Sequence, residues 1–268
     1  MLAPTLFCDV DGTYRGADGK NHKGDGWHNY STFSLWDTYR AKQPLMTLIQ
    51  TERAAHFVNS MLDICDQQGR LPVWHLWGNE TNCMVGDPAI PVVAGAIVKG
   101  IKGVDRERAF EAIKKTAATS ERGKGLRHQY GYIPCNLMNE AVAYDMEYAL
   151  ADGAAAEAAR ALGRGEDQEH FMRMSHSYRT YFDGQSGFIR GVDDKGEFNA
   201  TFSPYYASHR TTDYCEGNAW QYTWLVPHDI AEYALMFGSN EACLARLDSL
   251  FAASSVLEGD ASPDISGM

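Results

Sequence analysis

A single carboxylate stands just before three aromatic residues in the stretch YCEGNAWQYTWLVPHD, residues 214–229. The acid is Glu216, and the rings belong to Trp220, Tyr222 and Trp224. Two interpretations are open. In one, the rings pack inside the protein and the acid caps a helix. In the other, the rings hold the faces of sugar rings while the acid protonates a departing oxygen, as a general acid does in glycoside hydrolysis.

The sugar interpretation makes demands on Glu216. If residues 216–225 form a helix, Glu216 lies in its first turn, where the helix dipole favours the anion and lowers the pKa of the carboxyl. A general acid near neutral pH needs the opposite shift, so apolar neighbours would have to raise that pKa by desolvation. Trp220, four residues on, would lie on the same helix face. Hydrolysis also needs a second carboxylate, so Glu216 alone is not a mechanism.

A second acid occurs in SLWDTYR, residues 34–40. Asp37 precedes Arg40 by three residues, so the two can meet on one helix face. As a surface ion pair they would contribute only ~0.3–0.5 kcal/mol. In the sugar interpretation, Asp37 accepts hydrogen bonds from two hydroxyls while Trp36 stacks beside it.

Short polar residues crowd into the third stretch, WHLWGNETNCMVGD, residues 74–87. Asn79 and Glu80 lie among them, between two glycines. Because such residues are poor helix formers, we expect a loop at a helix start that faces a cleft, or else a capping cluster. His75 and Glu80 do not have the HExxH spacing of a zinc protease.

The elements that position these residues are mostly helical. Residues 1–29 are rich in Gly and Asp and predict turns and a hairpin, whereas residues 30–268 predict eight to ten helices in series. The loop 183–214 is long enough to be functional or to carry short strands. Helices are expected over 29–49, 51–68 capped by Thr51 and ended by Gly69, 87–101 with Pro88 in the first turn, 105–120 capped by Asp105, 139–163 with a break near Gly153, 166–183, 216–225 and 240–254.

Loops of alternating length join these helices, and no strict repeat is seen. The pattern therefore favours an all-α fold of antiparallel helix pairs around an axis, with loops gathered at one end.

Composition excludes several classes of protein. The 268 residues carry a net charge of −11, which argues against a nucleic-acid or anionic-membrane partner. The six cysteines form no CxxC pair, so neither a zinc site nor a redox motif is predicted. No apolar run approaches the length of a membrane span, and the first residues lack the features of a signal peptide.

Several stretches together resemble glycoside hydrolase family 92, the calcium-dependent, inverting exo-acting alpha-mannosidases. Their order and spacing agree with the family over nearly the whole chain. These stretches are LAPTLFCDVDGTYRGADG, NYSTFSLWDTYRAKQPL, LPVWHLWGNETNCMVG, YGYIPCN, EGNAWQYTWLVPHD and the tail ASPDISGM.

The resemblance implies one domain over residues 1–268, an incomplete (α/α)6 toroid that lacks the last helical hairpins and the family's N-terminal β-sandwich domain. It implies calcium, with most of its ligands and the general base outside this sequence, so the metal ligands stay unassigned. Asp87 and Pro88 stand where the family pattern has an aromatic residue and a histidine. By resemblance, Glu216 is the general acid, Asp37 holds the terminal mannose, and Trp36, Arg40, Asn79, Glu80 and Trp220 lie near the sugar subsites.

The implied activity is removal of terminal alpha-linked mannose from mannosides and N-glycans, by a bacterial, periplasmic or secreted protein. Two alternatives stay open: a non-catalytic carbohydrate-binding protein that keeps Asp37 and the aromatic residues, and a helical scaffold with no sugar function. Without its base, this length is expected to turn over weakly or not at all. Uncovered helix faces are expected to cause self-association.

Overall fold

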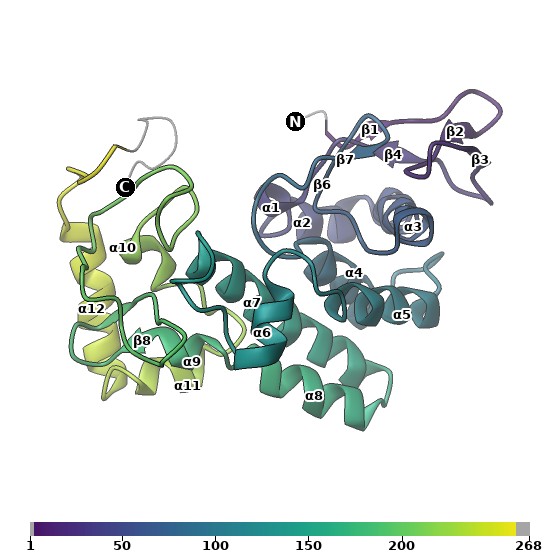
Figure 1. The fold of residues 1–268 in the computed structure, drawn as a ribbon. Helices are drawn as coiled ribbons and strands as arrows, with labels where there is room; N and C mark the ends of the chain where they lie inside the picture. The colour runs from purple at the N-terminus through teal and green to yellow at the C-terminus, as the bar shows by residue number, and fades with distance from the viewer. Residues whose placement is uncertain (1–2, 261–268) are drawn as a thin grey trace. The chain divides into compact units, whose positions relative to one another are not determined.

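The computed structural model describes residues 3–260, in which helices are the main regular structure and the sheets are small and antiparallel (Figure 1). The helical class is thus confirmed. The tail ASPDISGM lies outside the described residues. Helices α7 (Ala141–Ala161) and α8 (Gly165–Ser175) each run from one of two compact units into the other. Unit 1 comprises Met1–Thr119 and Ala154–Met172, and unit 2 comprises Ser120–Gly153 and Arg173–Met268.

Four helices pack together in unit 1: α2 (Lys42–Ile49), α3 (Thr51–Gln68), α4 (Ala89–Lys99) and α5 (Arg106–Ala117). On α3, Phe57, Met61 and Ile64 are buried, at the three- and four-residue spacing that predicted this helix. Their counterparts on α5 are Phe110 and Ile113. The apolar pattern of the sequence therefore identified this core correctly.

Helix ends in unit 1 were predicted with mixed success. Asp105 caps α5 by accepting hydrogen bonds from two backbone N–H groups, and Gly69 ends α3 in a left-handed conformation, both as predicted. Thr51 is wrong as a cap, because Gln50 occupies that position and makes no side-chain cap bond. Pro88 is the N-cap of α4 and does not lie in its first turn.

The short strands of unit 1 lie beside α3 (Figure 1). The predicted hairpin is confirmed as β2 (Thr13–Arg15) with β3 (Asn21–Lys23). The helix expected from residue 29 is wrong in its first part, because strand pairing takes up residues 30–34 before α1 (Leu35–Thr38) begins. One pairing joins β1 (Thr5–Leu6) to β4 (Tyr30–Ser31). In a second sheet, β6 (Trp74–Leu76) lies between β5 (Phe33–Ser34) and β7 (Asn79–Glu80) and pairs with both.

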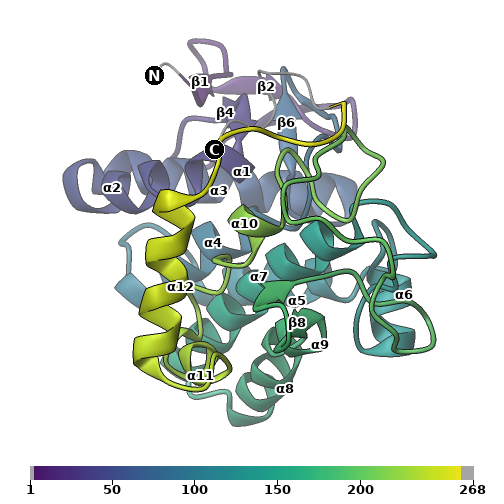
Figure 2. The same ribbon diagram turned by 90° about the vertical axis from the view of Figure 1, so that its left-hand side faces the viewer.

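Unit 2 contains short helices and one hairpin. The long loop after residue 182 carries strands of its own, as expected. Helix α12 (Asn240–Ala252) packs beside α11 (Ile230–Leu235) (Figure 2). Helix α6 (Lys124–Tyr130) lies outside the helices expected from the sequence. The elements are α6 (Lys124–Tyr130), α9 (Tyr178–Tyr181), β8 (Phe182–Asp183), β9 (Phe188–Ile189), α10 (Ala219–Tyr222), α11 (Ile230–Leu235) and α12 (Asn240–Ala252).

The break predicted near Gly153 is wrong, because α7 is continuous. A Cβ added at Gly153 would lie 2.8 Å from the Cβ of His228. The glycine therefore serves close packing against a distant residue and does not interrupt the helix.

A buried polar network ties the elements of unit 2 together. The Arg127 guanidinium donates to Asp145 and to Asp152, each at 2.6 Å. Asp145 also accepts hydrogen bonds from Ser177 and from the Tyr181 hydroxyl, both at 2.8 Å. Burial would lower the pKa of Arg127, but the two carboxylates outweigh it and raise that pKa. The network therefore fixes α6 and α9 against α7.

Candidate active site

Asp37 lies on α1, directly after strand β5, and its side chain is exposed. The Ser34 hydroxyl donates a hydrogen bond to its carboxylate. Ser34 pairs with Trp74 across β5 and β6. The structure thus brings the stretch that contains Asp37 beside the polar stretch that starts at residue 74, as a shared sugar site would require.

Arg40 is held against aromatic rings in unit 1. The centre of its guanidinium lies 4.6 Å from the Tyr39 ring centroid and 5.6 Å from that of Trp36. Both distances suit a cation–π contact. Trp36 is half-buried, so a partly covered ring lies beside the exposed carboxylate of Asp37.

Glu80 points into the backbone of its own hairpin. Its carboxylate accepts hydrogen bonds from the N–H groups of Val73 at 2.8 Å, Trp74 at 3.0 Å and Asn82 at 2.9 Å. Burial would raise the pKa of Glu80, but these N–H groups and the nearby Arg70 charge lower it. The expected loop at a helix start is therefore wrong for residues 74–80, which fold as a hairpin that Glu80 holds together, whereas residues 81–87 form a loop that leads into α4.

Glu216 lies in unit 2 just before α10, and it is half-buried. The expectation that it lies in the first helical turn is wrong, because α10 begins at Ala219. Asn218 and Gln221 form a capping box that sets this start. The backbone N–H of Trp220 donates to Asn218, and that of Asn218 donates to Gln221, each at 3.0 Å.

The backbone of Glu216 has a φ of 47°, a left-handed conformation that costs a residue with a side chain about 1–2 kcal/mol. Hydrogen bonds on one side of the acid fix it. The Tyr222 hydroxyl donates to the Cys215 carbonyl at 2.7 Å, and the Tyr214 hydroxyl donates to the Ile189 carbonyl at 2.6 Å. Two phenol rings thus position the acid's backbone, and strain held this way is typical of functional sites.

Trp220 is mostly covered by side chains of unit 2 and is only 7% exposed. Its ring meets Phe188 edge to face at 4.8 Å. The Arg246 guanidinium on α12 lies 4.6 Å from the Trp220 ring and 3.8 Å from that of Phe188. The packing interpretation therefore holds for this ring within the described residues.

Asp213 is a second acid near Glu216 that the sequence did not single out. Burial raises the pKa of its carboxyl, and a hydrogen bond with Asn199 only partly offsets this. A Cβ added at Gly191 would lie 2.2 Å from one of its oxygens, so the glycine makes room for the acid. Its place in the sequence, three residues before Glu216, was the only signal that could have pointed to it.

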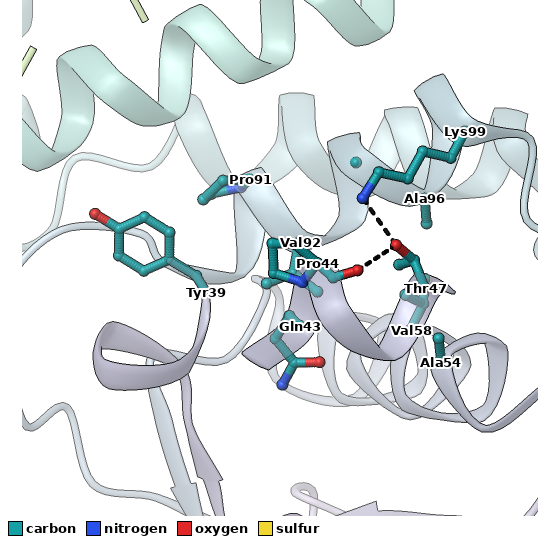
Figure 3. A pocket seen from close by; sticks show the side chains of 11 residues that line it. Tyr39, Gln43, Pro44, Thr47, Ala54, Val58, Pro91, Val92, Ala96 and Lys99 are labelled. Atoms are coloured by element: carbon teal, nitrogen blue, oxygen red, sulfur yellow. Dashed lines mark hydrogen bonds between the residues drawn. The ribbon is translucent and has the colours of Figure 1, made fainter. Parts of the chain in front are cut away.

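A cavity beside Tyr39 can be excluded as the sugar site. It lies among α2, α3 and α4 and measures about 30 Å³ (Figure 3). Thr47 closes one side by accepting a hydrogen bond from Lys99 at 2.8 Å. Because ligand pockets usually measure about 300–1,000 Å³, this one has room only for a water molecule.

The side chains of the described residues do not form a metal site on their own. Within residues 3–260, no group of three or more His, Cys, Asp or Glu side chains is arranged to hold a metal ion. Calcium takes about six to eight oxygen ligands, so these residues do not fit it on their own. In the same residues, no helix combines the length and the apolar character needed to cross a bilayer.

Comparisons with known proteins agree on one family. Residues 1–266 match the model of the glycosyl hydrolase family 92 catalytic domain. A family GH92 alpha-mannosidase from Bacteroides thetaiotaomicron, solved with mannoimidazole, is 41% identical, with a TM-score of 0.90 over 96% of this chain and 35% of that one. A GH92 inverting mannosidase from the same organism is 30% identical, with a TM-score of 0.82 over 92% of this chain and 34% of that one.

A curated relative, an uncharacterized secreted glycosidase of Arthroderma benhamiae, is 24% identical over 71% of this chain and 29% of its own length. The chain thus spans about a third of the length of these relatives.

Proposed function

The chain belongs to glycosyl hydrolase family 92, and we propose that it is catalytic-domain sequence of an alpha-mannosidase that removes terminal alpha-linked mannose from mannosides and N-glycans. The solved relatives are mannosidases, one of them inverting, which supports both the substrate and the mechanism. A secreted or periplasmic location fits the secreted relative.

Glu216 is the general acid in this proposal. It gives its proton to the glycosidic oxygen while a base outside the described residues activates water on the opposite face of the sugar. In an inverting enzyme the two carboxyls are roughly 6.5–9.5 Å apart, which leaves room for that water. The observation that carries the assignment is the left-handed backbone of Glu216, fixed by the Tyr222 hydroxyl.

Asp37 and Trp36 hold the terminal mannose in this proposal. An exposed carboxylate can accept hydrogen bonds from sugar hydroxyls, and a neighbouring indole can cover a sugar face. Arg40 keeps Trp36 in place through the ring contact described above. Asn79 and Glu80 contribute by shaping the hairpin beside them, and Trp220 supports the segment of Glu216.

The family fold would be an (α/α)6 toroid, and the helices that follow one another in series within each unit support this expectation. Calcium, expected from the family, would need ligands outside residues 3–260, and when bound it would orient sugar hydroxyls. Self-association would use the exposed apolar side chains of α11 and α12. These are Ile230, Leu235, Leu244 and Phe251, with exposed fractions of 67%, 56%, 61% and 83%.

Calorimetry with alpha-mannobiose, followed by a turnover assay with calcium, tests the proposal. Binding and turnover that Glu216→Gln abolishes would support it. Mannoside binding without turnover, even when an external nucleophile such as azide is supplied, would favour the non-catalytic carbohydrate-binding protein. A chain that binds no mannoside would reject both.

A further inference from the structure

The hairpin of β6 and β7 turns through Trp77 and Gly78, whose φ angles are 50° and 79°. Two positive φ values in a two-residue loop define the turn that Asn-Gly prefers. Asparagine tolerates this conformation, whereas a bulky residue is strained in it. The turn therefore carries a tryptophan where local backbone preference would select asparagine.

Trp77 lies at a point that the surrounding structure holds fixed. The Gly78 backbone N–H donates to the Ser31 hydroxyl at 3.1 Å, and the side-chain amide of Asn79 donates to the Trp77 carbonyl at 3.1 Å. A Cβ added at Gly78 would lie 2.9 Å from the Phe7 ring, so the turn sits directly on that ring. The indole is thus presented on a rigid support.

The ring itself is open to solvent. Trp77 is 59% exposed, although tryptophan side chains are highly buried on average. Among residues 3–260, no aromatic ring or cation is found stacked on it. Packing therefore does not explain why the turn holds this residue.

We propose that Trp77 is a stacking platform for a sugar ring of an extended alpha-mannoside. This deepens the proposed function and rests on it. A flat apolar indole covers the C–H face of a pyranose, and the exposed polar side chain of Asn79 beside it suits the hydroxyls at the ring edge. Trp77 is not among the residues assigned to the terminal mannose, so the platform would take a further sugar of a longer oligosaccharide.

Trp77→Asn tests the platform without endangering the fold, since asparagine suits the turn. We expect its melting temperature to stay equal to the wild type or to rise by about 2–4 °C as the strain is released. Calorimetry should show alpha-mannotetraose binding weakened about 5- to 10-fold, with methyl alpha-mannoside binding unchanged. Phe251→Ala removes another exposed aromatic side chain, on α12, and should alter neither affinity.

A fluorescence measurement gives an independent result. Alpha-mannotetraose should protect the wild-type chain from quenching by acrylamide, and this protection should be lost in Trp77→Asn. Equal tetraose affinity in the two proteins would overturn the platform but leave the proposed function standing. A wild type that binds no mannoside would overturn both. A lower melting temperature for Trp77→Asn would show that the tryptophan serves the turn and would also overturn the platform.

Discussion

Replacing Tyr222 with phenylalanine removes one oxygen and tests how Glu216 is positioned. The lost hydroxyl donates to the Cys215 carbonyl, in the residue directly before the acid. Tyr222 and Cys215 are each only 6% exposed, so water does not readily replace the missing donor. The left-handed backbone of Glu216 would then lose one of the contacts that hold it.

The size of the effect follows from these contacts. Loss of one intramolecular hydrogen bond costs about 0.5–1.5 kcal/mol net. Relaxation of the Glu216 backbone returns part of the roughly 1–2 kcal/mol of strain. We therefore expect Tyr222→Phe to lower the free energy of unfolding by about 0.5–1 kcal/mol, with a slope against denaturant equal to that of the wild type.

Guanidinium denaturation gives the stability, and mannoside turnover with azide supplied as the nucleophile gives the consequence for the acid. Tyr148→Phe is the matched control, because it also removes a hydroxyl that donates to a backbone carbonyl, that of Arg122. Both variants should lose similar stability, but only Tyr222→Phe should lose turnover, by about 10-fold or more since small misplacements are costly. Equal turnover in the two variants would refute the positioning role of Tyr222.

Four further predictions follow from the structure. Arg127→Met leaves two buried carboxylates without their cation and should cost about 3–5 kcal/mol in denaturation. Burial lowers the pKa of His228, so the unfolded chain binds its proton before the folded chain does as pH falls. The free energy of unfolding should therefore drop below pH ~6.5, and it should drop less steeply in His228→Gln. The double variant Leu244→Lys, Phe251→Lys should shift sedimentation toward monomer, and an unchanged profile would contradict association through α12. Calcium at 1 mM should leave the melting temperature of this chain unchanged, whereas a clear rise would reveal a site among its own residues.

Elements specified by neighbouring residues could be predicted from the sequence. Helix α3 follows from the spacing of Phe57, Met61 and Ile64, and α5 follows from its Asp105 cap. In both cases, the residues that specify the helix lie within it or directly before it. Hydrophobic periodicity and capping chemistry are therefore sufficient to find them.

Elements specified by distant contacts could not be predicted. The continuity of α7 at Gly153 depends on His228, which is far away in sequence. The β6–β7 hairpin depends on the hydrogen bonds that Glu80 accepts from the backbone. The polar composition around Glu80 indicated a loop and gave no sign of these bonds. The acid Glu216 was identified, but its left-handed backbone and the role of Tyr222 emerge only from the folded chain.

The central claim is that Glu216 supplies the proton to the departing sugar, and azide rescue tests it most directly. Azide attacks the anomeric carbon in place of activated water, so the bond to the leaving oxygen breaks without a general base, and the proton still has to come from the acid. With alpha-mannobiose, calcium and azide, the wild type should form mannosyl azide. Glu216→Gln should be slower by about 100-fold or more, whereas Asp213→Asn should keep most of the rate. Loss of product in Asp213→Asn with a normal rate in Glu216→Gln would contradict the account.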